Sequence, residues 1–101
     1  MSPKIVLVTG ANTGLGLEII RALYCSSQTY TIFVGSRSLD GAETAITELK
    51  SQYSGKTSTF EAIQVDVEDD VSIAAALDTV EKRFGVLDIL VNNAGMSLRS
   101  T

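Results

Sequence analysis

Residues 4–16 read KIVLVTGANTGLG, and their pattern is the main indication of the fold of the chain. Residues 4–9 form a nearly continuous apolar and β-branched run, which is typical of a strand buried on both faces of a parallel sheet. Three glycines follow the run, at Gly10, Gly14 and Gly16. Small and apolar residues then recur with the spacing of one helix face, at Gly16, Ile19, Ile20 and Leu23. The stretch therefore predicts a strand, a tight glycine-rich turn and a helix.

The rest of the chain repeats this alternation of strand and helix. We expect further strands at about residues 31–34, 58–65 and 86–91. Apolar residues with helical spacing separate them, first at Ala42, Ala45, Ile46, Leu49 and Tyr53, and then at Ile73, Leu77, Val80 and Phe84. Strands joined by helices in this way run parallel. The order predicts a partial α/β fold with about four parallel strands and three helices on both faces of the sheet.

Local residue choices mark the ends of the expected helices. Ser38 is a suitable N-cap for the second helix, and Gly85 is expected to end the third. The acidic run at residues 68–70 is expected in the first turn of the third helix, where it suits the helix dipole. A metal site there is the weaker alternative, because successive helical residues do not converge on one ion.

Composition limits the possible functions. The chain has 101 residues, of which 45% are hydrophobic, and this suits a single domain. Its net charge of −4 argues against binding to nucleic acid or to an anionic membrane. One cysteine and no histidine make a transition-metal site improbable and exclude an internal disulfide. We expect a cytoplasmic protein, because no signal peptide or run of about 20 apolar residues is present.

The glycine-rich turn is the strongest functional signal. A pyrophosphate is bound by bare backbone N–H groups and by the positive end of a helix. Glycines allow the tight turn and let a phosphate approach without a clash against Cβ. Gly16 also lies on the expected buried face of the helix, where its small size permits close contact with the strand. The alternative is a tight strand-to-helix turn without a ligand.

Three motifs together resemble one protein family. The stretch Thr9-Gly10-Ala11-Asn12-Thr13-Gly14-Leu15-Gly16 resembles the TGxxxGxG coenzyme motif of short-chain dehydrogenases/reductases. Further matches are Asp66-Val67 after the third strand and Asn92-Asn93-Ala94-Gly95 after the fourth. The resemblance implies a Rossmann-type fold that binds a nicotinamide dinucleotide. A P-loop is disfavoured, because no Lys-Ser/Thr pair follows the glycines.

The resemblance also implies a role for each matching residue. Gly10, Gly14 and Gly16 would shape the loop, while Asn12, Thr13 and Leu15 would contact the coenzyme. Asp66 would accept a hydrogen bond from the adenine amino group, with Val67 beside it. Asn93, Ala94 and Gly95 would line the ribose next to the nicotinamide, and Asn92 and Asn93 would tie the central strands together. The alternatives are a helix N-terminal residue for Asp66 and a polar strand-end turn for the Asn pair.

The end of the second strand favours NADP(H) over NAD(H). An acid about 20 residues after the glycines would bind the ribose 2′-hydroxyl of NAD. Here the sequence is Val34-Gly35-Ser36-Arg37-Ser38, and the next carboxylate is Asp40. Arg37 suits a 2′-phosphate, because its guanidinium binds phosphate bidentately. The alternative for Arg37 is a solvated surface arginine. One departure from the family pattern weakens the preference: Thr13 occupies the position where many NADP-preferring relatives have a basic residue.

The family's catalytic Ser and Tyr-x-x-x-Lys find no match in residues 1–101. The residues four positions after Tyr24, Tyr30 and Tyr53 are Gln28, Val34 and Thr57. We therefore name no catalytic residue. Residues 1–101 are interpreted as one partial NAD(P)-binding domain whose catalytic half is absent. The resemblance implies that this domain is the N-terminal part of an NADP-dependent carbonyl or alcohol oxidoreductase, with a role in secondary metabolism as the family-level expectation. The alternative is a catalytically inactive nucleotide-binding or interaction module, so activity of this chain alone stays open.

The expected fourth strand would leave an open, apolar edge, with Asp88 as its one protecting charge. Such an edge favours pairing with a second copy or with another partner. We expect a fragment or incomplete gene product. The alternatives are a natural half-domain and a chain completed by a partner.

Overall fold

The computed structural model describes residues 3–11 and 14–92. Its elements alternate along the chain: β1 (Lys4–Thr9), α1 (Gly14–Cys25), β2 (Tyr30–Ser36), α2 (Leu39–Gln52), β3 (Thr59–Gln64), α3 (Asp70–Phe84) and β4 (Ile89–Asn92). The strands form one parallel sheet in the order β3-β2-β1-β4. This architecture confirms the predicted α/β fold.

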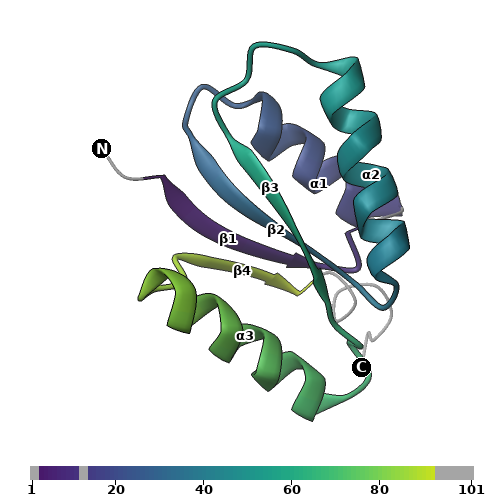
Figure 1. Cartoon of the computed structure of the whole chain (residues 1–101), viewed down its shortest axis with the longest axis vertical. Coiled ribbons are helices and arrows are strands. Elements are labelled where there is room, and N and C mark those ends of the chain that lie inside the picture. The colour runs from purple at the N-terminus through teal and green to yellow at the C-terminus, as the bar shows by residue number, and fades with distance from the viewer. Residues whose placement is uncertain (1–2, 12–13, 93–101) are drawn as a thin grey trace.

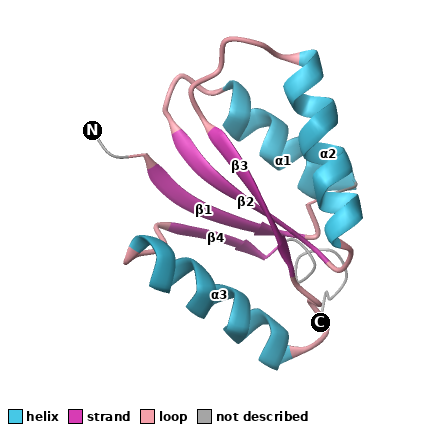
Figure 2. Cartoon of the chain, in the orientation of Figure 1, coloured by secondary structure: helices cyan, strands magenta, loops and turns pink. Residues whose placement is uncertain are grey.

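The sheet lies between two helical layers (Figure 1). Helices α1 and α2 cover one face, and α3 covers the other, as the element colours of Figure 2 make clear. The fully buried residues of β1 alternate between the layers. Val6 and Val8 pack in the cluster that contains Ile20 of α1, whereas Leu7 packs in the cluster that contains Val80 of α3. A run that is apolar at every position is thus explained by burial on both faces.

The helix ends follow the predicted signals, with one correction. Ser38 is the N-cap of α2, and its side chain accepts a hydrogen bond from the Gly41 amide. Gly85 ends α3 with a left-handed φ of 80°. The acidic run does not lie wholly in the first turn of α3, because the helix begins at Asp70. Asp69 is instead the N-cap, and its carboxylate accepts from the Val71 amide.

The fourth strand is shorter than predicted. It begins at Ile89, and Asp88 makes contacts of its own with β1. The Asp88 amide donates to the Ile5 carbonyl at 3.0 Å, and its carboxylate accepts from the Ile5 amide at 2.7 Å. The Asp88 side chain therefore takes a backbone donor that a longer strand would use. Its charge faces β1, so the expectation that it protects the outer edge is wrong.

No helix within the described ranges is both long and apolar enough to cross a membrane.

Candidate functional site

The parallel strands bring the predicted motifs together at one end of the sheet, where the carboxyl ends of the strands lie. The chain runs from β1 to β2 and β3 on one side, and then crosses to β4 on the other side of β1. Loops that leave β1 and β4 therefore diverge, and ligands of open α/β sheets bind in the crevice at such a point. The glycine turn follows β1, Arg37 follows β2 and Asp66 follows β3, while Asn92 ends β4. All four lie at carboxyl ends of parallel strands.

The glycine turn has a geometry that side chains would prevent. Gly10 and Gly14 have φ values of 62° and 58°, a region that residues with a Cβ rarely adopt. A β-carbon added to Gly16 would lie 2.1 Å from the Gly10 carbonyl oxygen and 2.9 Å from the Ala11 Cα. The start of α1 therefore touches the turn, so the close contact predicted for Gly16 is made with the turn after β1 rather than with the strand itself. Asn12 and Thr13 lie outside the described residues.

The start of α1 suits an anion. The first amides of a helix lack partners within the helix and carry its positive dipole end. The first turn of α1 contains no acidic residue. Leu15 is 56% exposed there, so its side chain is available to a ligand. Apart from Gly14 itself, its two chain neighbours and the nearby backbone of α1, no described heavy atom lies within 4 Å of the place where a Gly14 β-carbon would stand. This combination of open space and amides can accommodate a diphosphate.

A cavity of about 310 Å³ connects the glycine turn to the end of β2. It is lined by Gly10, Ser36, Arg37, Ser38, Val65 and Val67. Arg37 is exposed, so its guanidinium can reach a ligand phosphate. The oxygens of Ser36 and Ser38 accept local amide hydrogen bonds, and an accepting hydroxyl can still donate its proton. Val65 was not predicted as a site residue, although it directly precedes the Asp66 motif.

Asp66 holds the loop between β3 and α3. Its carboxylate accepts from the Glu68 amide at 3.0 Å, and its own amide donates to the Ser72 hydroxyl at 2.9 Å. The alternative that Asp66 is a helix residue is wrong, because α3 begins at Asp70. Asp66 is half-buried and does not line the cavity, whereas Val67 does. Ser72 was not predicted, because it lies beyond the Asp66 motif in α3.

Asn92 joins the edge strand β4 to its neighbour β1. Its side-chain oxygen accepts from the Thr9 hydroxyl at 3.1 Å, and β1 and β4 pair at the same residues. Asn92 thus ties two strands as expected, but in the described sheet one of them, β4, lies at the edge rather than at the centre. Asn93, Ala94 and Gly95 lie outside the described residues. The described part of the chain also holds no group of three acidic, Cys or His residues that could bind a metal ion.

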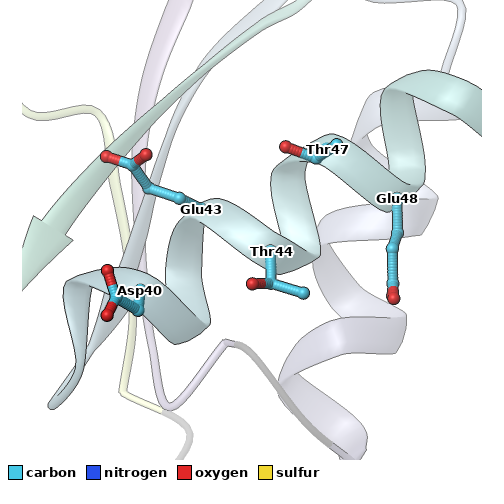
Figure 3. A pocket seen from close by; sticks show the side chains of 5 residues that line it. All are labelled: Asp40, Glu43, Thr44, Thr47 and Glu48. Carbon is cyan, nitrogen blue, oxygen red and sulfur yellow. The ribbon is translucent and has the colours of Figure 1, made fainter.

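A second concavity, of about 330 Å³, lies on α2 (Figure 3). It is lined by Asp40, Glu43, Thr44, Thr47 and Glu48. Three of these residues carry carboxylates and none is basic, so the surface repels phosphate. Figure 3 shows that their side chains point in different directions along one helix. We therefore assign the functional site to the cavity beside Gly10.

Comparison with known proteins gives consistent matches. The family model described as short chain dehydrogenase matches residues 4–101. Short-chain dehydrogenase/reductase tropE of Talaromyces stipitatus is 45% identical over 97% of this chain and 37% of its own length. Carbonyl reductase [NADPH] 1 of Homo sapiens is 36% identical over 94% of this chain and 32% of its own.

A solved structure adds a match in three dimensions. Menthone neomenthol reductase from Mentha piperita has a TM-score of 0.72 and 38% identity, over 95% of this chain and 33% of its own. The chain thus spans about a third of the length of these relatives.

Proposed function

The chain belongs to the short-chain dehydrogenase family, and from this premise we propose that it binds NADP(H) as the coenzyme-binding part of an oxidoreductase. The proposed reaction transfers hydride between NADP(H) and a carbonyl or alcohol. The observation that carries the proposal is that Gly10 and Arg37 line the same cavity. A ligand in this cavity would lie beside both the glycine turn and Arg37.

The proposed binding mode assigns the diphosphate and the 2′-phosphate to different elements. The amides at the start of α1 would bind the diphosphate, with Gly10 and Gly14 shaping the turn. Arg37 and the hydroxyls of Ser36 and Ser38 would bind the ribose 2′-phosphate. Residues 35–39 supply no carboxylate that would select the 2′-hydroxyl of NAD. The human relative, carbonyl reductase [NADPH] 1, is named for NADPH, which supports a preference of this chain for NADP(H).

The other motif residues complete this binding mode. Val67 would contact the adenine ring, and Asp66 would accept from the adenine amino group with the oxygen that the Glu68 amide does not use. Asn92 holds β4 against Thr9, so that residues 93–95 would follow at the nicotinamide ribose. Asn12, Thr13 and Leu15 would contact the diphosphate side of the coenzyme.

When bound, the coenzyme supplies or accepts the hydride. The described residues would bind and orient it, and we assign none of them to the proton transfer. The acid–base residues would come from chain that these 101 residues do not contain. A substrate from secondary metabolism and a cytoplasmic location stay predictions.

Coenzyme titration tests the proposal. We expect the purified chain to bind NADPH more tightly than NADH in a fluorescence or calorimetric titration. Arg37→Ala should weaken NADPH binding about 10- to 100-fold, the value of a hydrogen bond to a charged group, with NADH binding unchanged. Lys56→Ala is the matched control, because it also removes one positive charge, but from the loop before β3, at the opposite end of the strands from Arg37. A folded chain that binds neither coenzyme would refute the proposal.

The second candidate function is a nucleotide-binding module without catalysis. It is favoured by Tyr24, Tyr30 and Tyr53, none of which has a lysine four residues later. Both candidates predict coenzyme binding, so turnover separates them. NADPH oxidation by the chain alone, measured at 340 nm with a panel of ketones and aldehydes, would exclude the inactive module.

We also propose that the outer edge of β4 is covered in the working protein. Among the described residues β4 pairs with β1 alone, and Ile89 and Leu90 are 37% and 43% exposed. Relatives about three times as long support a covering by further chain, and a second copy is the alternative.

A further inference from the structure

Three consecutive carbonyl groups hold the end of β2 in place. The Gly35 carbonyl accepts from the Ala11 amide at 3.0 Å, and the Ser36 carbonyl accepts from the Val65 amide at 2.8 Å. The Arg37 carbonyl accepts from the Gln64 side-chain amide at 3.0 Å. The backbone that carries the Arg37 side chain is therefore tied to both neighbouring loops.

The Gln64 bond differs from the other two. Ala11 and Val65 donate through backbone amides, which any residue except proline supplies. Gln64 donates through its side chain, so this bond depends on the residue type. Ser36 and Gln64 form the last pair of the β2–β3 ladder. The glutamine amide thus extends the ladder by one residue, to the position of Arg37.

A fixed backbone matters for an arginine that binds phosphate. The guanidinium fork binds two phosphate oxygens at once, so its attachment point and direction decide whether both bonds form. Fixing that attachment before binding removes part of the ordering cost that the ligand would otherwise meet. Gln64 carries no charge, and it binds the carbonyl of Arg37 rather than its guanidinium.

We propose that Gln64 is a positioning residue that sets the selectivity for the 2′-phosphate by fixing Arg37. The inference rests on the proposed binding of NADP(H). If Gln64 only stabilised the fold, its loss would lower the affinities for NADPH and NADH equally, because the two coenzymes share the rest of the binding mode. If Gln64 positions Arg37, its loss lowers mainly the affinity for NADPH, the coenzyme that carries the 2′-phosphate.

The test compares NADPH and NADH affinities in Gln64→Met, which keeps the length of the side chain and removes its donor. We expect the NADPH-to-NADH affinity ratio to fall about 3- to 10-fold, as for one lost hydrogen bond, while NADH affinity stays within about twofold. Gln52→Met, the same change at an exposed residue of α2, should leave the ratio unchanged. Gln64→Asn shortens the side chain by one methylene and should also lower the ratio.

A double-variant cycle separates this inference from the proposed function. In an Arg37→Ala background, Gln64→Met should have no further effect on the ratio. If Arg37→Ala lowers the ratio and either Gln64 variant leaves it intact, the positioning role is refuted and the proposed function stands. Equal losses of NADPH and NADH affinity in Gln64→Met would also refute the positioning role. If Arg37→Ala has no effect on the ratio, the 2′-phosphate assignment itself fails.

Discussion

Gly16 is the residue at which packing and helix propensity give opposite predictions. Replacing a helical glycine with alanine ordinarily stabilises a helix by about 1 kcal/mol. At Gly16 the new Cβ would lie 2.1 Å from the Gly10 carbonyl oxygen, and backbone atoms cannot move aside as a flexible side chain would. We expect Gly16→Ala to lower the free energy of unfolding by about 1–3 kcal/mol, as overpacking does. Urea denaturation measures it.

The control for this variant is Gly55→Ala. Gly55 has a φ of 74° and open space around it, so alanine there introduces backbone strain without a clash. Gly55→Ala should lower the free energy of unfolding without weakening NADPH binding, whereas Gly16→Ala should lower both the free energy of unfolding and the affinity for NADPH. Increased stability of Gly16→Ala would contradict the close approach of α1 to the turn.

At the residue scale, local sequence predicts contacts within one turn and misses contacts between distant strands. The close packing of Gly16 was predictable, because strand, turn and helix follow one another within residues 4–16. Asp88 pairs with Ile5 across 83 positions, and Gln64 reaches Arg37 across 27. Both bonds depend on strand register, which the hydrophobic pattern of a strand buried on both faces leaves undetermined.

Among the elements, α3 depends on its N-cap. The Asp69 carboxylate accepts from the Val71 amide at 3.0 Å and so satisfies one of the first free donors of the helix. We expect Asp69→Ala to lower the free energy of unfolding by about 1 kcal/mol. Asp69→Asn keeps the accepting oxygen and should lose much less. Equal losses in thermal unfolding of the two variants would assign the effect to charge instead of capping.

An ion pair joins β3 to α3 and makes stability depend on pH. Arg83 donates to both carboxylate oxygens of Glu61, at 2.9 and 3.1 Å, and its guanidinium lies 5.7 Å from the Phe33 ring centre. These hydrogen bonds hold the pKa of Glu61 below its ordinary value of 4.5. A lowered pKa in the folded state stabilises the fold above pH 4.5, and this contribution is lost as the pH falls through the lowered value.

We therefore expect Glu61→Gln to flatten the pH dependence of stability in the acid range. The change should lower the unfolding temperature modestly at pH 7, because the pair is solvent-exposed. Below the folded pKa of Glu61 the two proteins should converge. Glu48→Gln is the matched control, since Glu48 is exposed on α2 and no ion pair involves it among the described residues. Parallel curves for wild type and Glu61→Gln would contradict the role of this pair.

The existence of each element was easier to predict than its length. The apolar pattern predicts that the second strand ends at Val34, but β2 continues to Ser36, because Gly35 and Ser36 still pair with β3. The prediction started the fourth strand at Val86, but β4 begins at Ile89 because the Asp88 carboxylate takes the Ile5 amide. Apolar patterning reports burial, and hydrogen bonds from neighbouring elements decide where pairing starts and ends.

At the scale of the whole molecule, the sheet has two edges of different character. On the β3 side, α2 packs against the sheet, and Phe60 stacks on Tyr24 with ring centres 4.5 Å apart. On the β4 side, Val86, Ile89 and Leu90 are all more than a third exposed. Open apolar strands pair readily with other strands. The β4 edge is therefore the expected contact surface between copies of this 101-residue chain.

Self-association through this edge should depend on concentration and on Leu90. We expect sedimentation velocity to show dimers or larger species as the concentration of the chain rises. Leu90→Lys places a charge on the edge strand and should shift the chain toward monomer. Because Leu90 is 43% exposed, the substitution should cost little folding stability. Val71→Lys is the control, since Val71 is 76% exposed on α3 and lies outside the edge. A wild-type chain that stays monomeric at every concentration, or equal effects of both lysines, would show that β4 does not mediate assembly.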